Sequence, residues 1–354
     1  GHADAMRRDY EVHEHGLEKL IAKSGKVRDS EAEVRIDRPA ERRPGSTRFT
    51  VQIAPSLAVT MLDALPYLAD YPYGCTEQTM SRFLPSVITS RTLESFGLRP
   101  REIAGRIFGG IERQHAAATH PDGAKELKKL DEMVRDGLRR LHDFQHGDGG
   151  WGWWKQGDSD HFMTAYVVWG LGLARDAGIR IDQQALRRGV EFLQRELVEE
   201  ERRPHLQAWM LHALSAEAAS RRAQPTKFQR TALDNLWNQR DGLNAYSRSL
   251  LALSAHHMGD AERAQVLVRN LVNGVKRDRS PDTSVVMRGA QRSGHGVIGT
   301  AHWGADGLYW RWADGPVEAT SFALRALLAI DPGNELIEPV TNWLIKNRRG
   351  AQWS

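Results

Sequence analysis

The feature of this sequence that most constrains its fold is a helix start that recurs at regular intervals. An alanine followed by an aromatic residue opens a helical stretch rich in leucine and alanine at positions 165–166, 208–209 and 245–246. These starts lie 43 and 37 residues apart, and a related start at 319–322 follows 74 residues later, twice 37. A period near 40 residues that contains two helices is typical of stacked helical hairpins. The chain is therefore expected to be mainly α-helical.

Stacked hairpins form either an open solenoid or a closed α/α toroid, and two features favour the toroid. Small residues at the repeated starts let inner helices approach closely, while the outer helices carry the arginine and glutamate residues. Neither end of the sequence shows the polar capping repeat that an open solenoid needs. We therefore expect an α/α toroid, a barrel of helical hairpins, over residues 55–354. Its helices are expected at residues 57–68, 75–90, 102–118, 124–144, 163–177, 182–199, 206–219, 227–239, 245–257, 261–272, 318–330 and 336–346.

Residues 1–54 are expected to be extended rather than helical. Apolar and polar residues alternate at 34–36 and 49–53, as they do in half-buried strands. Residues 37–45, between them, contain the prolines and the glycine of a turn. Such a segment is too short to form a stable sheet alone and needs partner strands. No further run of strands is expected after residue 54.

Composition and charge exclude several classes of protein. Of the 354 residues, 40% are hydrophobic and 27% charged, as in a folded globular protein. No uncharged apolar run reaches about 18 residues, so neither a transmembrane helix nor membrane contact is expected. The net charge of +4 comes from scattered arginines, which argues against nucleic acid as a partner. The start, Gly1-His2-Ala3-Asp4, lacks a signal-peptide pattern and is typical of a cloning remnant.

The single cysteine lies in the most informative segment of the chain. One cysteine excludes an intrachain disulfide and a cysteine-based zinc site, and the histidines show no metal-ligand spacing, so no metal or other cofactor is expected. A lone cysteine is usually a small buried apolar residue. Cys75, however, follows Gly74 at an expected helix start, where unpaired N–H groups stabilise a thiolate. Gln78 is three residues on, so its side-chain carbonyl can lie over Cys75 within one helical turn.

That spacing permits an internal acyl transfer between Cys75 and Gln78. The Cys75 thiolate would attack the Gln78 amide carbonyl and ammonia would leave. The product, a β-cysteinyl-γ-glutamyl thioester, is a stored electrophile. Glu77 lies in the first helical turn, where a negative charge suits the helix dipole. Met80 is expected in the core.

The twelve residues at 71–82, Tyr-Pro-Tyr-Gly-Cys-Thr-Glu-Gln-Thr-Met-Ser-Arg, resemble the thioester signature of the alpha-2-macroglobulin and complement family, in particular its bacterial branch. Segments at 47–58, 164–168 and 318–324 also resemble that family, so the similarity covers roughly residues 10–354. Members of the family usually have further residues after the region that corresponds to the C-terminal end of this sequence. The resemblance therefore implies an excised fragment, truncated at its C-terminal end.

The resemblance also implies a fold and a function. Residues 55–354 would form an α/α-toroid thioester domain, and residues 1–54 part of a split CUB-like domain. In the family, a protease cleaves a bait region elsewhere in the chain, and the exposed thioester acylates a lysine amine or a hydroxyl on the attacker. This implies a broad-spectrum protease inhibitor rather than an enzyme, with proteases and the remaining macroglobulin-like domains as partners. A role in bacterial defence in the periplasm, at the cell envelope or outside the cell is implied with it.

Four further residues are candidates for a role near the thioester. Tyr71 and Tyr73 flank the cysteine, and they either pack locally or shield the thioester from water. Relatives that prefer hydroxyl acceptors use a histidine in the loop before a Thr-Ala-aromatic helix start, and His161 has that position here, although the loop differs in length and sequence. His161 is equally an ordinary helix-start residue. His302, near the second aromatic loop, is the alternative.

Two other functions stay open on the residues alone. Aromatic loops at 148–154 and 306–312 precede two inner helices, and they either brace one end of the toroid or stack against a ligand. Ligand stacking would suit an α/α-toroid enzyme such as a terpenoid cyclase, a prenyltransferase-like protein or a polysaccharide lyase. Against that enzyme, the sequence has no aspartate-rich diphosphate motif and no Asp/His/Cys zinc set. The third possibility is a binding scaffold with an inert cysteine.

Overall fold

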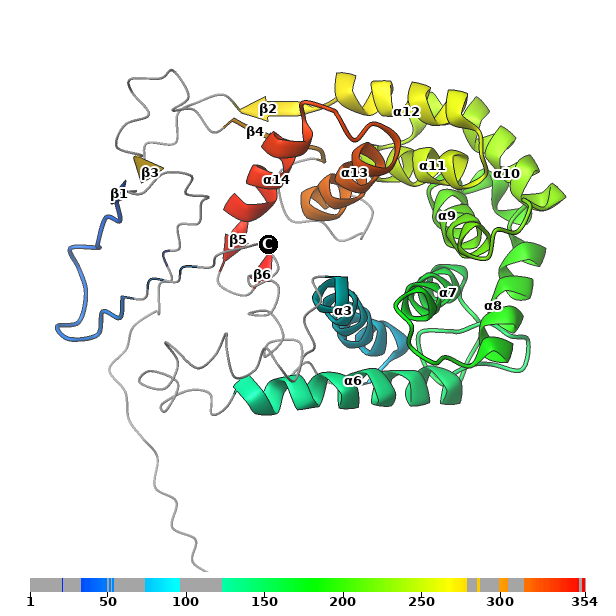
Figure 1. The fold of residues 1–354 in the computed structure, drawn as a ribbon, viewed down its shortest axis with the longest axis horizontal. Coiled ribbons are helices and arrows are strands. Elements are labelled where there is room, and N and C mark those ends of the chain that lie inside the picture. Colours follow the sequence, from blue (N-terminus) through cyan, green and yellow to red (C-terminus); the bar gives the residue numbers. More distant parts are fainter. Residues whose placement is uncertain are drawn as a thin grey trace, which may run out of the picture.

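The computed structural model describes residues 33–49, 74–95, 123–278, 299–304 and 315–349, together with 21, 51, 53, 285–286 and 352–353. These residues are mainly helical (Figure 1). The α-helices are α3 (Thr76–Ser95), α6 (Gly123–Asp143), α7 (His161–Asp176), α8 (Gln183–Glu196), α9 (Pro204–Ser220), α10 (Lys227–Asn238), α11 (Ala245–His257), α12 (Ala261–Asn273), α13 (Pro316–Ile330) and α14 (Ile337–Lys346). Two short 3₁₀ helices are η2 (Glu199–Arg202) and η3 (Arg240–Gly242).

Every helix expected within the described residues is present. Helix ends agree with the expectation to within three residues, except that α3 continues to Ser95. Local capping explains the agreement, because side chains such as Asn244 and Asp260 accept hydrogen bonds from the first free N–H groups of α11 and α12. The helices expected at 57–68 and 102–118 lie outside the described residues.

The helices form two concentric layers around a common axis (Figure 1). The inner layer consists of helices α3, α7, α9, α11 and α13. Each of these helices contacts the next one in this order. Each inner helix packs against the outer helix that follows it: α6, α8, α10, α12 or α14. This arrangement confirms the predicted α/α toroid. Because every outer helix returns the chain, the inner helices all run in one direction.

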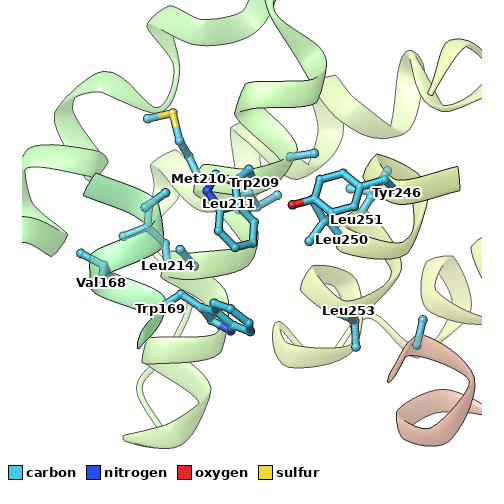
Figure 2. Packing of buried hydrophobic residues seen from close by; sticks show 14 of the residues in the cluster. Val168, Trp169, Trp209, Met210, Leu211, Leu214, Tyr246, Leu250, Leu251 and Leu253 are labelled. Carbon is cyan, nitrogen blue, oxygen red and sulfur yellow. The ribbon is translucent and has the colours of Figure 1, made fainter. Parts of the chain in front are cut away.

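Aromatic side chains from the inner helices meet at the axis of the toroid. Trp169 and Trp209 pack edge to face with ring centroids 5.5 Å apart, and Tyr246 packs against Phe322 at 5.2 Å. Figure 2 shows Trp169, Trp209 and Tyr246 directed towards one another from three helices. Three of these rings come from the repeated helix starts, so the repeat in the sequence places an aromatic ring from each hairpin in one central cluster.

Two tryptophans fix the start of inner helices in the same way. The Trp151 amide donates to Thr164 Oγ1 (2.8 Å), and its indole Nε1 donates to the Leu141 carbonyl (2.7 Å). The Trp303 amide likewise donates to Thr320 Oγ1 (3.0 Å), and Trp303 Nε1 donates to a carbonyl of α12 (2.8 Å). Sequence comparison placed the second aromatic loop at 306–312, which lies outside the described residues. The equivalent of Trp151 is Trp303.

The strands after residue 54 were not predicted from the sequence, but they are two or three residues long, belong to separate pairs and form no further run of strands within the described residues. Strand β2 (Lys276–Asp278) pairs antiparallel with β4 (Thr300–His302), between α12 and α13. Strand β1 (Glu33–Val34) pairs with β3 (Val285–Val286), and β5 (Arg348–Arg349) pairs with β6 (Gln352–Trp353), both antiparallel. All three side chains of β2 are exposed and charged, so this strand lacks the apolar alternation that would have predicted it.

The segment before the toroid keeps apolar side chains in solvent. Val34 and Ile36 are partly exposed, whereas Phe49, Val51 and Ile53 are 71%, 65% and 82% exposed. Among the described residues of this segment only β1 is a strand, and its partner strand is formed by residues 285–286. No described helix is long and apolar enough to cross a membrane.

A candidate thioester site at the start of α3

Cys75 and Gln78 are joined by two reciprocal hydrogen bonds. The backbone N–H of Cys75 donates to the side-chain oxygen Oε1 of Gln78 (3.1 Å), and the backbone N–H of Gln78 donates to Cys75 Sγ (3.4 Å). Cys75 is the residue before α3 and is only 7% exposed. The pattern is that of a capping box, in which the cap and a residue three positions on satisfy each other's N–H groups. It holds the Gln78 side chain folded back over the Cys75 thiol.

This arrangement suits attack of the thiol on the amide. The Gln78 carbonyl oxygen already accepts an N–H bond, and the same donor would stabilise the negative charge that develops on this oxygen during attack. The second bond places a backbone N–H on the sulfur, where it stabilises a thiolate. Cys75 is buried, so bulk water has little access to the bond that would form.

A loop distant in sequence holds the start of α3 in place. We call residues 148–154 the tryptophan loop. The Thr76 amide donates to the Trp153 carbonyl (2.9 Å), and Thr76 Oγ1 donates to the Gly152 carbonyl (2.6 Å). Thr76 is completely buried. This bonding supports the bracing role of the loop, and it identifies Thr76 as a site residue that sequence reasoning missed. A threonine directly after the cysteine was the only available signal.

Gly74 leaves the space that the folded glutamine needs. A Cβ at position 74 would collide with Gln78 Oε1 and would lie 3.9 Å from the Trp154 ring. The Gly74 carbonyl accepts from Arg140 Nη2 (3.4 Å), and Arg140 Nε donates to Thr79 Oγ1 (3.4 Å). The backbone before Cys75 is therefore tied to α6. Glycine is required for close approach of a side chain, not for an unusual backbone angle.

Comparison with known proteins agrees with this geometry. Residues 51–200 match the family model of the A-macroglobulin TED domain. Over these residues, which include Cys75 and Gln78, the chain is similar to the thioester domain of the alpha-2-macroglobulin family. It is 35% identical over 145 residues to the alpha-2-macroglobulin of Thermotoga maritima, a match that covers 41% of this chain and 7% of that protein.

Solved structures show the same fold. Escherichia coli alpha-2-macroglobulin activated by porcine elastase superposes with a TM-score of 0.52 at 20% identity, over 83% of this chain and 22% of that one. Salmonella alpha-2-macroglobulin reacted with methylamine gives 0.52 at 17% identity, over 80% of this chain and 16% of that one. This chain thus spans a small part of each of these proteins.

Other residues of the expected site have defined places in the thioester domain. Glu77 accepts from Ser81 Oγ (2.5 Å) in the first turn of α3. Met80 is fully buried, as predicted. Tyr166 is partly buried beside this turn, and desolvation, opposed by its hydrogen bond to Ser81, raises the pKa of its phenol so that it stays neutral. Tyr71 and Tyr73 lie outside the described residues.

His161 faces the outer layer of the thioester domain. Its Nδ1 lies 2.5 Å from Glu200 Oε1, its Nε2 lies 3.7 Å from Glu196 Oε2, and its ring packs against Phe192 at 5.7 Å. The carboxylates come from α8 and η2, whereas Cys75 precedes α3. Both ring nitrogens are therefore engaged by carboxylates in this conformation.

His302 takes part in a different contact. Its ring stacks on Trp343 at 4.7 Å with the planes 7° apart, which joins β4 to α14. Within the described part of the chain, no group of three or more histidine, cysteine, aspartate or glutamate side chains could hold a metal ion.

Proposed function

We propose that Cys75 and Gln78 form an internal thioester through which a longer protein carrying this domain captures proteases. The observation that carries the proposal is the reciprocal pair of hydrogen bonds between the two residues. The thiolate sulfur bonds to Gln78 Cδ, the C–N bond breaks, and the amide nitrogen leaves as ammonia with the thiol proton. An attacking amine or hydroxyl then takes the acyl group, and Cys75 is released as a thiol.

The thioester is consumed in a single acyl transfer and is not regenerated. The domain would therefore act as a covalent inhibitor and not as an enzyme. The related Escherichia coli protein that was solved after activation by porcine elastase supports a protease as the trigger. Salmonella alpha-2-macroglobulin reacted with methylamine supports a small amine as a probe. A periplasmic or cell-envelope location, a preceding CUB-like domain and a role in bacterial defence belong to the same proposal.

Intact mass spectrometry of freshly purified protein tests the proposal. A thioester lowers the mass by one ammonia and blocks the Cys75 thiol towards thiol reagents. Methylamine should then free the thiol and convert Gln78 to its methylamide, and Cys75→Ala should show neither change. An unmodified mass with a reactive thiol in both this chain and the longer protein would refute the thioester. That result would favour a scaffold with an inert cysteine or a toroid enzyme.

A further inference from the structure

A cavity lies at the opposite end of the toroid from Cys75. It has a volume of about 240 Å³ and opens where α7, α9 and α11 end, at Asp176, Ser220 and His257. Arg325 of α13 closes its fourth side. Because the inner helices run in one direction, their last turns are remote from the start of α3. Nothing in the thioester chemistry uses this cavity.

Arg325 is an uncompensated cation at this cavity. Its guanidinium lies over the rings of Trp169 (5.0 Å) and Phe322 (5.3 Å), and it makes no hydrogen bond or ion pair within the described residues. Burial and the nearby Arg91 lower the pKa of Arg325 to about 10, so it keeps its charge at neutral pH. Arg325 is half-buried, and a partly desolvated cation next to a second cation and without a carboxylate favours an anionic partner.

The acidic residues that line the cavity are already neutralised. Glu217 accepts from Arg175 Nη1 (2.9 Å) and Arg221 Nε (2.7 Å), and these bonds hold its pKa below the usual range despite the opposing effect of burial. Asp176 accepts from Arg175 Nε (3.3 Å) and from a serine hydroxyl. Both carboxylates are paired with groups other than Arg325. The positive charge of Arg325 at the cavity is therefore not neutralised by them.

Unpaired nitrogen atoms gather beside this charge. Trp169 is 8% exposed and its Nε1 has no hydrogen-bond partner. His257 lines the cavity with Nδ1 unpaired, and the ring of the fully buried His212, with both nitrogens unpaired, stacks on it at 5.7 Å. Burial lowers the pKa of His257 to about 4 and that of His212 well below its usual range, so both rings are neutral at pH 7. Indole and imidazole N–H groups seek acceptor oxygens.

The remaining walls are apolar, and one of them is left bare. Val168 and Leu173 of α7 and Ala216 of α9 line the cavity, and Gly172 of α7 also lines it with no atom within 4 Å of the position of a Cβ. Glycine within a helix costs about 1 kcal/mol relative to alanine. The volume is below the ~300–1,000 Å³ of pockets for drug-sized ligands, so the cavity suits a smaller molecule.

We infer that this cavity binds a small organic carboxylate, with the carboxylate on Arg325 and a short apolar chain against Trp169 and Leu173. The uncompensated guanidinium requires an anion, the unpaired N–H groups require acceptor oxygens, and the apolar walls require a hydrocarbon body. The inference is independent of the thioester, because it uses residues at the other end of the toroid.

Binding of 4-methylpentanoate, followed by calorimetry and by Trp fluorescence, tests the inference. The carboxylate should bind, and the isosteric 4-methylpentanamide should bind at least about tenfold more weakly, because it lacks the charge. Arg325→Gln should weaken binding of the carboxylate by about tenfold or more. Arg263→Gln is the matched control: Arg263 also lies over a ring, Trp237 at 5.2 Å, but it is paired with Asp234 (2.6 Å) in the outer layer.

A second variant tests the location of the site without changing any charge. Gly172→Leu places a side chain in the empty space and should abolish binding while the helical circular dichroism signal and thermal stability are retained, since leucine favours a helix. Absence of carboxylate binding to the unaltered protein at millimolar concentration and low salt would overturn the inference. Equal binding by Arg325→Gln or by Gly172→Leu would overturn it as well.

Discussion

At the scale of single residues, the site depends on one hydrogen-bonded pair and on the glycine before it. Cys75 and Gln78 satisfy each other's amides, and the pairing is possible because Gly74 has no side chain. The same two bonds that cap α3 also bring sulfur and carbonyl together. Helix capping and the proposed thioester chemistry would therefore use one geometry, and a change that spares the helix would still remove the chemistry.

Gly74→Ala should separate these two roles. The added methyl group collides with Gln78 Oε1, which is the end of a flexible side chain, so the glutamine moves away and the fold survives. We expect a reactive Cys75 thiol and an unmodified Gln78 in otherwise folded protein, measured by thiol titration and intact mass. Gly147→Ala is the control, because no atom lies within 4 Å of its Cβ position. A blocked thiol in Gly74→Ala would contradict this account of the glycine.

His161→Ala tests whether this histidine decides the acceptor. If His161 leaves Glu196 and Glu200 to attack the thioester, imidazole carries the acyl group and the Cys75 thiolate acts as base for a hydroxyl. The variant should then shift conjugation from glycerol towards methylamine, measured as a product ratio. The control is His205→Ala, since His205 lies near the start of the next inner helix and bonds Ser247 Oγ (2.9 Å). An unchanged ratio would assign His161 to the structure of the helix start.

At the scale of elements, the tryptophan loop and α3 form one unit although some 75 residues separate them in the chain. Thr76 bonds two consecutive carbonyls of the loop, and His146 bonds the loop again, with Nε2 3.2 Å from the Trp154 carbonyl. Trp151 then links the loop to α6 and α7. The position of the cysteine is thus determined by the packing of two helical hairpins, not by α3 alone.

Thr76→Val should weaken this unit. The substitution keeps the shape and the backbone bond to Trp153, but it leaves the Gly152 carbonyl without its hydroxyl donor. An unsatisfied buried acceptor costs about 1–3 kcal/mol, so the urea midpoint should fall and less protein should carry the thioester. Thr92→Val is the matched control on the same helix, where the hydroxyl bonds the Ile88 carbonyl (2.8 Å) on the exposed surface. Equal loss in both variants would show that the loop contact has no special role.

Sequence reasoning was reliable for elements with local signals and failed where a distant contact decides. Helices α11 and α12 could be predicted because Asn244 and Asp260 cap them locally. The β2–β4 pair could not, since its exposed, charged residues carry no alternation. The Cys75–Gln78 pairing followed from helical spacing. Thr76 contacts the tryptophan loop, and His161 contacts carboxylates of α8 and η2. Because these partners belong to other elements, the spacing of residues within one helix does not predict the contacts.

At the scale of the whole molecule, polarity changes along the toroid axis. One end presents the start of α3 and the tryptophan loop, with Trp153 and Trp154 44% and 61% exposed. The centre is filled with aromatic rings, and the other end holds Arg325 above neutral histidines. The two ends therefore have different chemistry, and each can be altered without contact to the other.

Buried neutral histidines should make the fold sensitive to mild acid. The folded-state pKa of His257 is lowered to about 4 by burial, His256 and Arg325, whereas an unfolded histidine titrates near 6.5. Its contribution to stability is present above pH ~6.5 and is lost as the pH falls towards 4, because the unfolded chain binds the proton first. The urea midpoint should drop between pH 7 and pH 5, and should drop less in His257→Gln.

The exposed neighbour on the same turn provides the control for this pH effect. His256→Gln removes an exposed histidine that lowers the pKa of His257 less than burial does, so most of the decrease between pH 7 and pH 5 should remain in this variant. The carboxylate of Glu217 has a lowered pKa, so its loss of stability begins at lower pH than this interval. An identical decrease in the His257 variant would show that other groups cause it.

Protection of the thioester is expected to require more than this domain. The apolar side chains of Phe49, Val51 and Ile53 and the two exposed tryptophans are surfaces that further domains could cover. If the domain belongs to a longer protein, as proposed, we expect the isolated chain to lose its thioester faster than that protein, measured as thiol release over time, and Tyr71→Gly to accelerate loss in both. Equal lifetimes in the isolated and the longer chain would show that the helical domain protects its own bond.

The bonding of Thr76 to the tryptophan loop also sets the order of events during synthesis. A ribosome that has made the chain only to α3 has made both partners of the proposed thioester but not the Gly152 and Trp153 carbonyls that fix their helix start. The acyl transfer is therefore expected only after residue 154 has emerged and the second hairpin has docked. In this sense the electrophile is a chemical record that folding has passed a defined point, and a chain that stalls earlier carries an ordinary, unreactive glutamine.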